Sequence, residues 1–382
     1  MPKVWTVADL FSGSGGMSTG FHRHGHYRII GAADKQLAKP SNYAGPGTSC
    51  NLTYEQNIGV RPLDADIFDL DPGEWRRDHL GVGRGELNVL ISCAPCTGFS
   101  QKNARNHTAD DRRNSLVARS AEFIAELMPE VFVMENVKEL MVGRNPHHFI
   151  LLRDRLEDLG YSVTAEVHDL AEYGLPQLRK RALVLAHRDR PMPPMSPRPG
   201  QPLCTVRDAI GHLPPIAAGE QHPDDPMHLA PSHNEVSMER IRATPHDGGS
   251  WSDLLGTEHE HLLIPSMLRP DRRSGSFPDI YGRLWWDQPA RTVTRECGHP
   301  GNGRYLHPEQ DRMVSVREMA LLQGFPPDYT FVGKMASRYN QIGDAVPPLI
   351  ASQIASHVAS VLDGSYVEPD HVGPAQLELA SA

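Results

Sequence analysis

The chain has few cysteines and no long apolar segment. Its 382 residues include only five cysteines, an odd number at scattered positions (Cys50, Cys93, Cys96, Cys204 and Cys297), which favours a reducing compartment over a disulfide-rich secreted protein. The longest apolar runs are far too short to cross a bilayer, and the chain does not open with a basic stretch followed by an apolar one. We therefore expect a cytoplasmic protein without membrane contact.

The chain also has no excess of positive charge. The net charge is −9, from 38 basic and 47 acidic residues, which argues against a protein that coats nucleic acid through bulk charge. A basic cleft on an acidic body remains possible, with arginine clusters at 179–181, 268–273 and 283–304 as candidates. The close pair His259 and His261 has no further ligand pattern, so we predict no metal site.

The first half of the chain alternates strand-like and helix-like segments. This alternation predicts an α/β fold with a parallel sheet and helices on its faces, and the length predicts two domains. A proline-rich stretch, 188–202, predicts a domain boundary before the loop-rich segment 203–305. The expected strands are 4–9, 28–33, 87–92, 131–134 and 182–186, and the expected helices are 115–128, 148–159, 316–322 and 347–362.

Reactive side chains follow the expected strands. Cys96 comes shortly after the apolar run 87–91, Glu135 follows the run 131–134, and Arg179 and Arg181 alternate on a third strand-like segment. Strand ends are where α/β folds place their chemistry. A thiol, a carboxyl that could donate a proton and an arginine pair indicate attack on an electron-poor ring.

Each of these residues has a plainer interpretation. The C-x-x-C spacing of Cys93 and Cys96 also fits a redox pair or half of a metal site, although no second C-x-x-C exists. For Cys93 we prefer a buried, inert cysteine. Glu135 could cap the next helix, and the two arginines could form a solvated basic edge.

A glycine-rich turn follows the first strand. The segment 9–17 reads as a strand, a turn and a helix start, and its glycines would let the backbone approach a ligand. A simple tight turn is the alternative. Asp34 ends the next strand, where a carboxylate can bind ribose hydroxyls, and Asp66 could accept from an adenine amino group. Together these positions indicate a nucleoside cofactor.

The order of the motifs resembles the cytosine-5 DNA methyltransferase family. The resemblance covers the chain from 4 to about 360 and is highly specific. It is carried by Asp-Leu-Phe-Ser-Gly-Ser-Gly-Gly (9–16), Pro-Cys (95–96), Phe-Ser (99–100), Glu-Asn-Val (135–137), Gln-x-Arg-x-Arg (177–181), Arg-Glu-Met-Ala-Leu-Leu-Gln-Gly-Phe-Pro (317–326) and Gln-Ile-Gly-Asp-Ala-Val-Pro (341–347).

The resemblance implies a Rossmann-like class I methyltransferase sheet in an S-adenosylmethionine-binding domain, 1–187 plus 315–365. It also implies a smaller, loop-rich target-recognition domain, 190–312, followed by a tail, 366–382. Cys96 would be the nucleophile, supported by Glu135, Arg179 and Arg181. The cofactor would be lined by Phe11, Gly13, Gly15, Asp34, Asp66, Ile67, Pro95, Leu116, Asp344 and Val346. Lys102, Arg105, Arg112 and Arg113 would contact DNA phosphates from a loop that closes over the site.

The reaction implied is methyl transfer to C5 of a cytosine flipped out of double-stranded DNA. The enzyme would be a monomer, with a cognate restriction endonuclease acting separately. Transfer to RNA cytosine is an alternative, as is DNA binding without catalysis, against which the intact Cys96, Glu135 and Arg181 argue.

The sequence departs from the family pattern at three places. Thr97 replaces the glutamine that usually follows Pro-Cys, and Asp34-Lys35 replaces a glutamate followed by an apolar residue. Asp344 replaces an asparagine that, by the resemblance, lies close to the methyl-bearing end of the cofactor. Asp344 is either a tolerated substitution, protonated or solvated, or a sign that the enzyme prefers a different transferred group from a modified cofactor.

Overall fold

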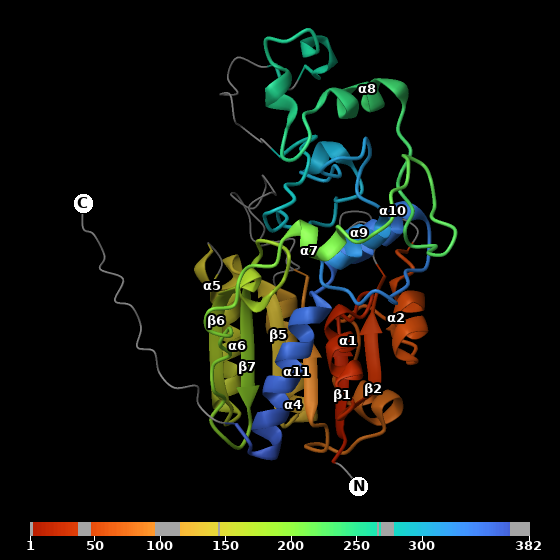
Figure 1. Cartoon of the computed structure of the whole chain (residues 1–382). Coiled ribbons are helices and arrows are strands. Elements are labelled where there is room, and N and C mark those ends of the chain that lie inside the picture. The colour runs from red at the N-terminus through yellow and green to blue at the C-terminus, as the bar shows by residue number, and fades with distance from the viewer. Residues whose placement is uncertain are drawn as a thin grey trace, which may run out of the picture.

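The computed structural model describes residues 3–36, 47–95, 115–143, 146–265, 267–268 and 279–366. One lobe is built on a seven-stranded sheet of order β3-β2-β1-β4-β5-β7-β6, and the other consists of helices and irregular segments (Figure 1). The strands are β1 (Trp5–Leu10), β2 (Tyr27–Asp34), β3 (Leu63–Asp64), β4 (Val89–Ser92), β5 (Val131–Val137), β6 (Ser162–Asp169) and β7 (Lys180–His187). The α/β prediction is confirmed, except that β7 runs antiparallel to both of its neighbours, β5 and β6.

The strands extend beyond the expected apolar runs. β5 continues to Val137 because its pairing with β7 does not end at Met134, and Val137 lies opposite Arg181. Glu135 is therefore inside the strand, not after it. The two strands that the sequence analysis did not predict, β3 and β6, lie at the edges of the sheet. β3 has two residues and β6 carries polar side chains along its length, so neither forms an apolar run.

Helices cover both faces of the sheet. The predicted helices are confirmed to within one residue at either end, as α4, α6, α9 and α11. The α-helices are α1 (Gly16–Arg23), α2 (Cys50–Ile58), α3 (Pro72–Glu74), α4 (Ser115–Leu127), α5 (Glu139–Val142), α6 (His147–Asp158), α7 (Val206–Ile210), α8 (Glu235–Ala243), α9 (Val316–Leu322), α10 (Met335–Asp344) and α11 (Pro348–Asp363). Shorter helical turns are η1 (Trp75–Leu80), η4 (Leu170–Tyr173), η5 (Trp251–Leu254), η6 (Glu260–Leu262) and η7 (Pro300–Asn302).

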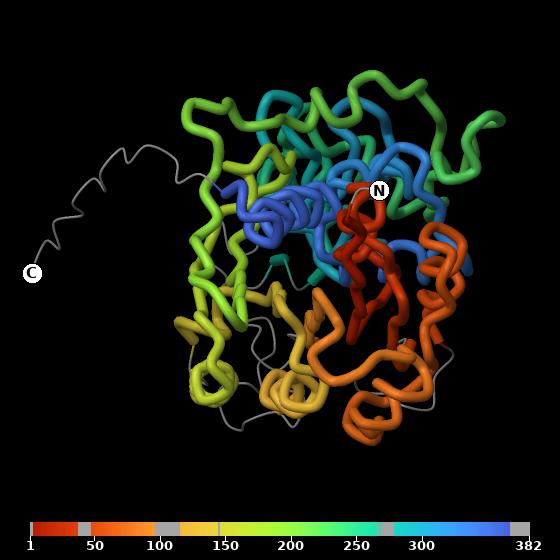
Figure 2. Tube along the Cα trace, turned by 90° about the horizontal axis from the view of Figure 1, so that it is seen from below, coloured from red at the N-terminus to blue at the C-terminus, as the bar shows by residue number. Residues whose placement is uncertain are grey.

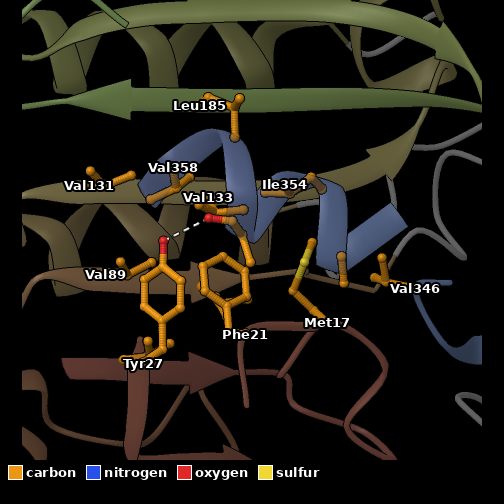
Figure 3. Packing of buried hydrophobic residues seen from close by; sticks show 14 of the residues in the cluster. Met17, Phe21, Tyr27, Val89, Val131, Val133, Leu185, Val346, Ile354 and Val358 are labelled. Atoms are coloured by element: carbon orange, nitrogen blue, oxygen red, sulfur yellow. Dashed lines mark hydrogen bonds between the residues drawn. The ribbon is translucent and has the colours of Figure 1, made fainter. Parts of the chain in front are cut away.

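The alternation of side chains along each strand divides the core between the two faces. Val131 and Val133 of β5 join the cluster beneath α1 and α11, whereas Phe132 and Met134 join the cluster beneath α4 and α6. Seen from below, α11 lies on one side of the strands and α4 and α6 on the other (Figure 2). The Tyr27 hydroxyl donates to the Ala355 carbonyl at 2.8 Å, which ties β2 to α11 (Figure 3).

The end of the chain belongs to both lobes. α9 and α10 contribute Met319 and Tyr339 to a third cluster that also holds Val206 and Leu284, while α11 returns to the sheet. The helical stretch Met335–Asp363 is long and apolar enough to cross a membrane, but 67% of its most apolar segment is buried inside the protein. That burial identifies it as part of the core.

Candidate active site

The parallel strands end on the side of the sheet that faces the second lobe (Figure 1), and the described candidate residues lie in or near these strand ends. Parallel strands place their carboxyl ends along one edge, so loops that are far apart in sequence meet there. β1 leads into the glycine-rich loop, β2 ends at Asp34, and β4 leads through Cys93 to Pro95.

The loop after β1 bends sharply and leaves open space beside one glycine. Phe11, Gly13 and Gly15 have φ angles of 60°, 51° and 89°, so the loop repeatedly uses left-handed backbone. A Cβ at Gly15 would lie 3.1 Å from the Tyr54 ring, whereas no described atom comes within 4 Å of a Cβ at Gly13. The Gly13 N–H donates to Asp34 Oδ2 at 3.0 Å.

Asp34 and Asp66 are both held by hydrogen bonds. Asp34 Oδ1 accepts from the Gln36 N–H at 2.6 Å, and burial raises the pKa of this carboxyl. Asp66 accepts from Lys35 Nζ at 2.5 Å and from the Phe68 N–H at 3.0 Å. The unusual Lys35 thus pairs with the second acid of the site.

Apart from Pro95, the apolar residues predicted to line the cofactor belong to hydrophobic clusters on both faces of the sheet. Ile67 and Leu116 are buried in one cluster, and Phe11 packs against it. Val346 belongs to the cluster on the opposite face of the sheet, where its backbone lies so close to Gly16 that a Cβ there would clash. Pro95 is exposed.

Asp344, the third departure from the family pattern, has a charged partner. Its Oδ2 accepts a hydrogen bond from Arg295 Nη1, from a segment that precedes α9. The Asp344 side chain is 41% exposed, and that of Arg295 only 17%. The carboxylate is therefore neutralised by an arginine, an arrangement that the sequence analysis did not consider.

A buried ion pair occupies the end of β5. Arg181 Nε lies 3.0 Å from Glu135 Oε1, and the two side chains are 13% and 8% exposed. Arg181 is opposite Val137 in the β5–β7 ladder, which makes it the diagonal neighbour of Glu135 on the same face. Arg179 instead donates from Nη1 to the Val293 carbonyl at 2.9 Å and so holds the second lobe.

Asn136 connects this pair to the loop after β4. Its Nδ2 donates to the Ala94 carbonyl at 3.0 Å, and the Glu135 N–H approaches Cys93 Sγ at 3.5 Å. Cys93 is half-buried, and burial raises the pKa of its thiol well above the usual value, which favours the protonated form.

Several predicted residues lie outside the described part of the chain. They are the nucleophile Cys96, the neighbouring Thr97, and the four proposed DNA contacts Lys102, Arg105, Arg112 and Arg113. Ala94 and Pro95 are the described residues that lead toward Cys96.

Three functional candidates were missed from the sequence. Asn136 and Arg295 were overlooked because their partners, Ala94 and Asp344, are far away in the chain. Asp9 was quoted only as part of a motif, yet it is 1% exposed and its carboxylate accepts from Ser18 Oγ at 2.6 Å. Burial raises the Asp9 pKa to about 7.

The described residues fit a nucleoside ligand with polar hydrogen-bonding groups. Ser12 Oγ is buried and has no hydrogen-bond partner in the described part of the chain, and it adjoins the open space at Gly13. Asp34 and Asp66 end neighbouring segments and retain acceptor capacity for hydroxyl and amino groups.

Comparison with solved structures identifies the class of fold. The chain resembles a prophage-encoded protein of Escherichia coli (TM-score 0.68, 19% identity, covering 94% of this chain and 99% of the other). It also resembles the methyltransferase EhMeth of Entamoeba histolytica (TM-score 0.62, 15% identity, covering 94% and 99%). At these identities the likeness concerns the fold, which is that of class I methyltransferases.

Comparison of sequences identifies the family. The profile of the C-5 cytosine-specific DNA methylase family matches residues 5–360. The type II methylase M.HgiDII of Herpetosiphon aurantiacus is 32% identical over 366 residues, 94% of this chain and 97% of the relative. The type II methyltransferase M1.HphI of Haemophilus parahaemolyticus is 33% identical, over 92% and 86%. The chain belongs to the C-5 cytosine-specific DNA methylase family, which confirms the resemblance, and is a DNA (cytosine-5) methyltransferase.

Proposed function

We propose that the chain methylates C5 of a cytosine flipped out of duplex DNA, through a covalent bond between Cys96 and C6 of the ring. The observation that carries this proposal is the buried Arg181–Glu135 pair, which lies beside the strand loop leading to Cys96. The Asn136 bond to Ala94 supports it, because this bond holds that loop against the strand that carries Glu135.

The cofactor would be held by the three loops described above. S-adenosylmethionine supplies an electrophilic methyl group when it is bound. Asp34 would accept from the ribose hydroxyls and Asp66 from the adenine amine, while the Gly13 loop leaves room for the backbone to approach. The apolar lining would come from Phe11, Ile67, Pro95, Leu116 and Val346, and the remaining contacts from Gly15 and Asp344.

The protein's own residues would carry the chemistry on the base. The Cys96 thiolate adds to C6, which makes C5 nucleophilic. Glu135 binds N3 and the exocyclic amine, and Arg181 binds the carbonyl oxygen of the base while orienting the carboxylate. After C5 has accepted the methyl group, its proton leaves to a base, the Cys96–C6 bond breaks, and the thiolate is restored. Arg179 supports this site by anchoring the second lobe at Val293.

The division of labour between the lobes follows from the same proposal. Residues 1–187 and 315–365 would bind the cofactor, and 190–312 would recognise the DNA sequence. Lys102, Arg105, Arg112 and Arg113 would contact phosphates. Because relatives such as M.HgiDII are type II methylases, we propose a cytoplasmic monomer that acts on double-stranded DNA independently of any cognate restriction endonuclease.

The ion pair at Asp344 bears on which group is transferred. A lone carboxylate near the cofactor would favour a cationic or hydrogen-bond-donating group. The Arg295 partner removes that reason, because the pair as a whole has no net charge. We therefore favour plain methyl transfer over a modified cofactor.

Mass spectrometry of nucleosides from a host that expresses the chain tests the proposal. We expect 5-methylcytosine in the DNA, and its loss in a Cys96→Ala control. A cytosine adduct of another mass would favour the modified cofactor, and modified cytosine in RNA alone would replace DNA as the substrate. Modification that persists in Cys96→Ala would overturn the covalent mechanism.

A further inference from the structure

We infer that Arg295 sets the preference of the cofactor site between S-adenosylmethionine, whose sulfur is cationic, and the product S-adenosylhomocysteine, whose sulfur is neutral. It would do so by cancelling the charge of Asp344. This inference rests on the proposed cofactor. It assigns Arg295 a positioning role that neither the family motifs nor the charge pattern of the sequence indicated.

Arg295 is held firmly against the end of α10. The Thr294–Arg295 backbone lies so close to Gly343 that a Cβ there would be 2.7 Å from the Arg295 Cα. Two residues further on, Cys297 Sγ lies 3.3 Å from the Tyr339 carbonyl. The backbone that carries Arg295 is therefore fixed to the helix that carries Asp344, so the pair forms between two well-held segments.

Asp344 requires a cation because of its place in the helix. It is the last residue of α10, where the unpaired carbonyls make the helix end partly negative, so a carboxylate there is unfavourable on its own. Arg295 satisfies this requirement from another part of the chain.

The Arg295 side chain of this pair is largely buried, whereas that of Asp344 is partly exposed at the edge of the candidate site. Burial lowers the pKa of Arg295, and the acids Glu296, Cys50 and Asp34 act against that shift. Ser14 Oγ of the glycine-rich loop donates to the Gln341 carbonyl of α10 at 3.3 Å, so the helix that carries Asp344 is tied to the loop proposed for the cofactor. Only two residues after Asp344, Val346 packs against Gly16 of the glycine-rich loop.

The charge balance of this region explains what the pair would do. Methyl transfer converts a sulfonium cation into a neutral thioether. An unpaired Asp344 would stabilise the reactant cation more than the product, and an unpaired Arg295 would do the reverse. If several ångströms of a partly buried site separate the unpaired charge from the cofactor sulfur, that charge changes the ratio of the affinities for S-adenosylmethionine and S-adenosylhomocysteine by roughly tenfold.

Four forms of the full-length protein separate these effects: the wild type, Arg295→Gln, Asp344→Asn and the double variant. Isothermal titration calorimetry with S-adenosylmethionine and with S-adenosylhomocysteine measures the ratio of the two dissociation constants in each form. We expect Arg295→Gln to shift the ratio about tenfold toward S-adenosylmethionine and Asp344→Asn to shift it about tenfold the other way. The double variant should return close to the wild-type ratio.

Two controls keep the result interpretable. Arg295→Lys retains the charge and should keep the wild-type ratio. Arg207→Gln breaks an exposed ion pair with Asp287, 2.7 Å in length, and should leave the ratio unchanged. If Arg295→Gln does not fold, Asp344→Asn still gives one arm of the test.

The outcomes distinguish this inference from the proposed function. Equal losses of affinity for both ligands, with a constant ratio in all four forms, would mean that the pair is only structural and would overturn the inference. A wild type that binds neither ligand would overturn the proposed cofactor, and the inference with it.

Discussion

Replacing Arg181 by methionine tests the pair at the centre of the proposed mechanism. Methionine keeps much of the length of the side chain but removes the cation. The structure leaves Glu135 with 8% of its side chain exposed, so water cannot readily replace the lost guanidinium. The variant therefore leaves a carboxylate buried without its partner.

The expected cost follows from that burial. Breaking a buried pair costs about 3–5 kcal/mol, whereas an exposed pair contributes about 0–1 kcal/mol. Arg23→Met provides the matched control, since Arg23 and Asp328 pair at 2.8 Å with 42% and 70% of their side chains exposed. We expect Arg181→Met to lower the free energy of unfolding by about 3 kcal/mol or more and Arg23→Met by less than about 1 kcal/mol.

Urea denaturation followed by circular dichroism measures both costs, and transfer of a labelled methyl group to DNA measures activity. The double variant Glu135→Gln/Arg181→Met removes both charges, so it should recover much of the stability but none of the activity. Equal small losses for Arg181→Met and Arg23→Met would refute our account of the buried pair. Recovery of activity in the double variant would refute the proposed role of Glu135.

Three further predictions concern the surroundings of the site. The Asp9 pKa is raised to about 7, so its stabilising contribution is complete below about pH 4 and lost as the pH rises through 7. Asp9→Asn should flatten the decline in unfolding free energy between about pH 4 and pH 7, and an unchanged slope would count against a buried acid. Asn136→Ala removes the hydrogen bond to the Ala94 carbonyl and should lower the methylation rate, measured by single-turnover kinetics, about 100-fold. Cofactor affinity, measured by calorimetry, should not change, and a normal rate would exclude a role for Asn136 in positioning the loop that leads to Cys96. Gly16→Ala forces a Cβ against the Val346 backbone, so it should lower the free energy of unfolding by about 1–3 kcal/mol and weaken cofactor binding. A variant with unchanged stability and normal binding would contradict the close packing of Gly16 against Val346.

The sheet was largely predictable because its strands are apolar and buried on both faces. β1, β2, β4, β5 and β7 each contain a run that the sequence analysis found. The edge strands β3 and β6 were missed because an edge strand of two residues, or one with polar side chains, has no such run.

The candidate site was only partly predictable. The glycine-rich turn and the position of Asp34 at the end of a strand could be predicted, because they depend on local backbone geometry and on the end of an apolar run. The proposed roles of Asp34 and Asp66 toward a cofactor stay predictions. Arg179 and Arg181 were expected to act as a pair, but they diverge: Arg181 reaches Glu135, while Arg179 reaches Val293.

The sequence by itself determined the order of strands and helices, the glycine-rich turn and the family motifs, because these depend on periodicity, backbone freedom and residue order along the chain. Tertiary structure decided which of the two arginines meets Glu135, and which residue pairs with Asp344. Arg181 reaches Glu135 because β7 returns antiparallel to β5, and Arg295 reaches Asp344 because a loop of the second lobe packs on the end of α10. Such pairs depend on how distant segments are brought together in space, which no local pattern in the sequence records.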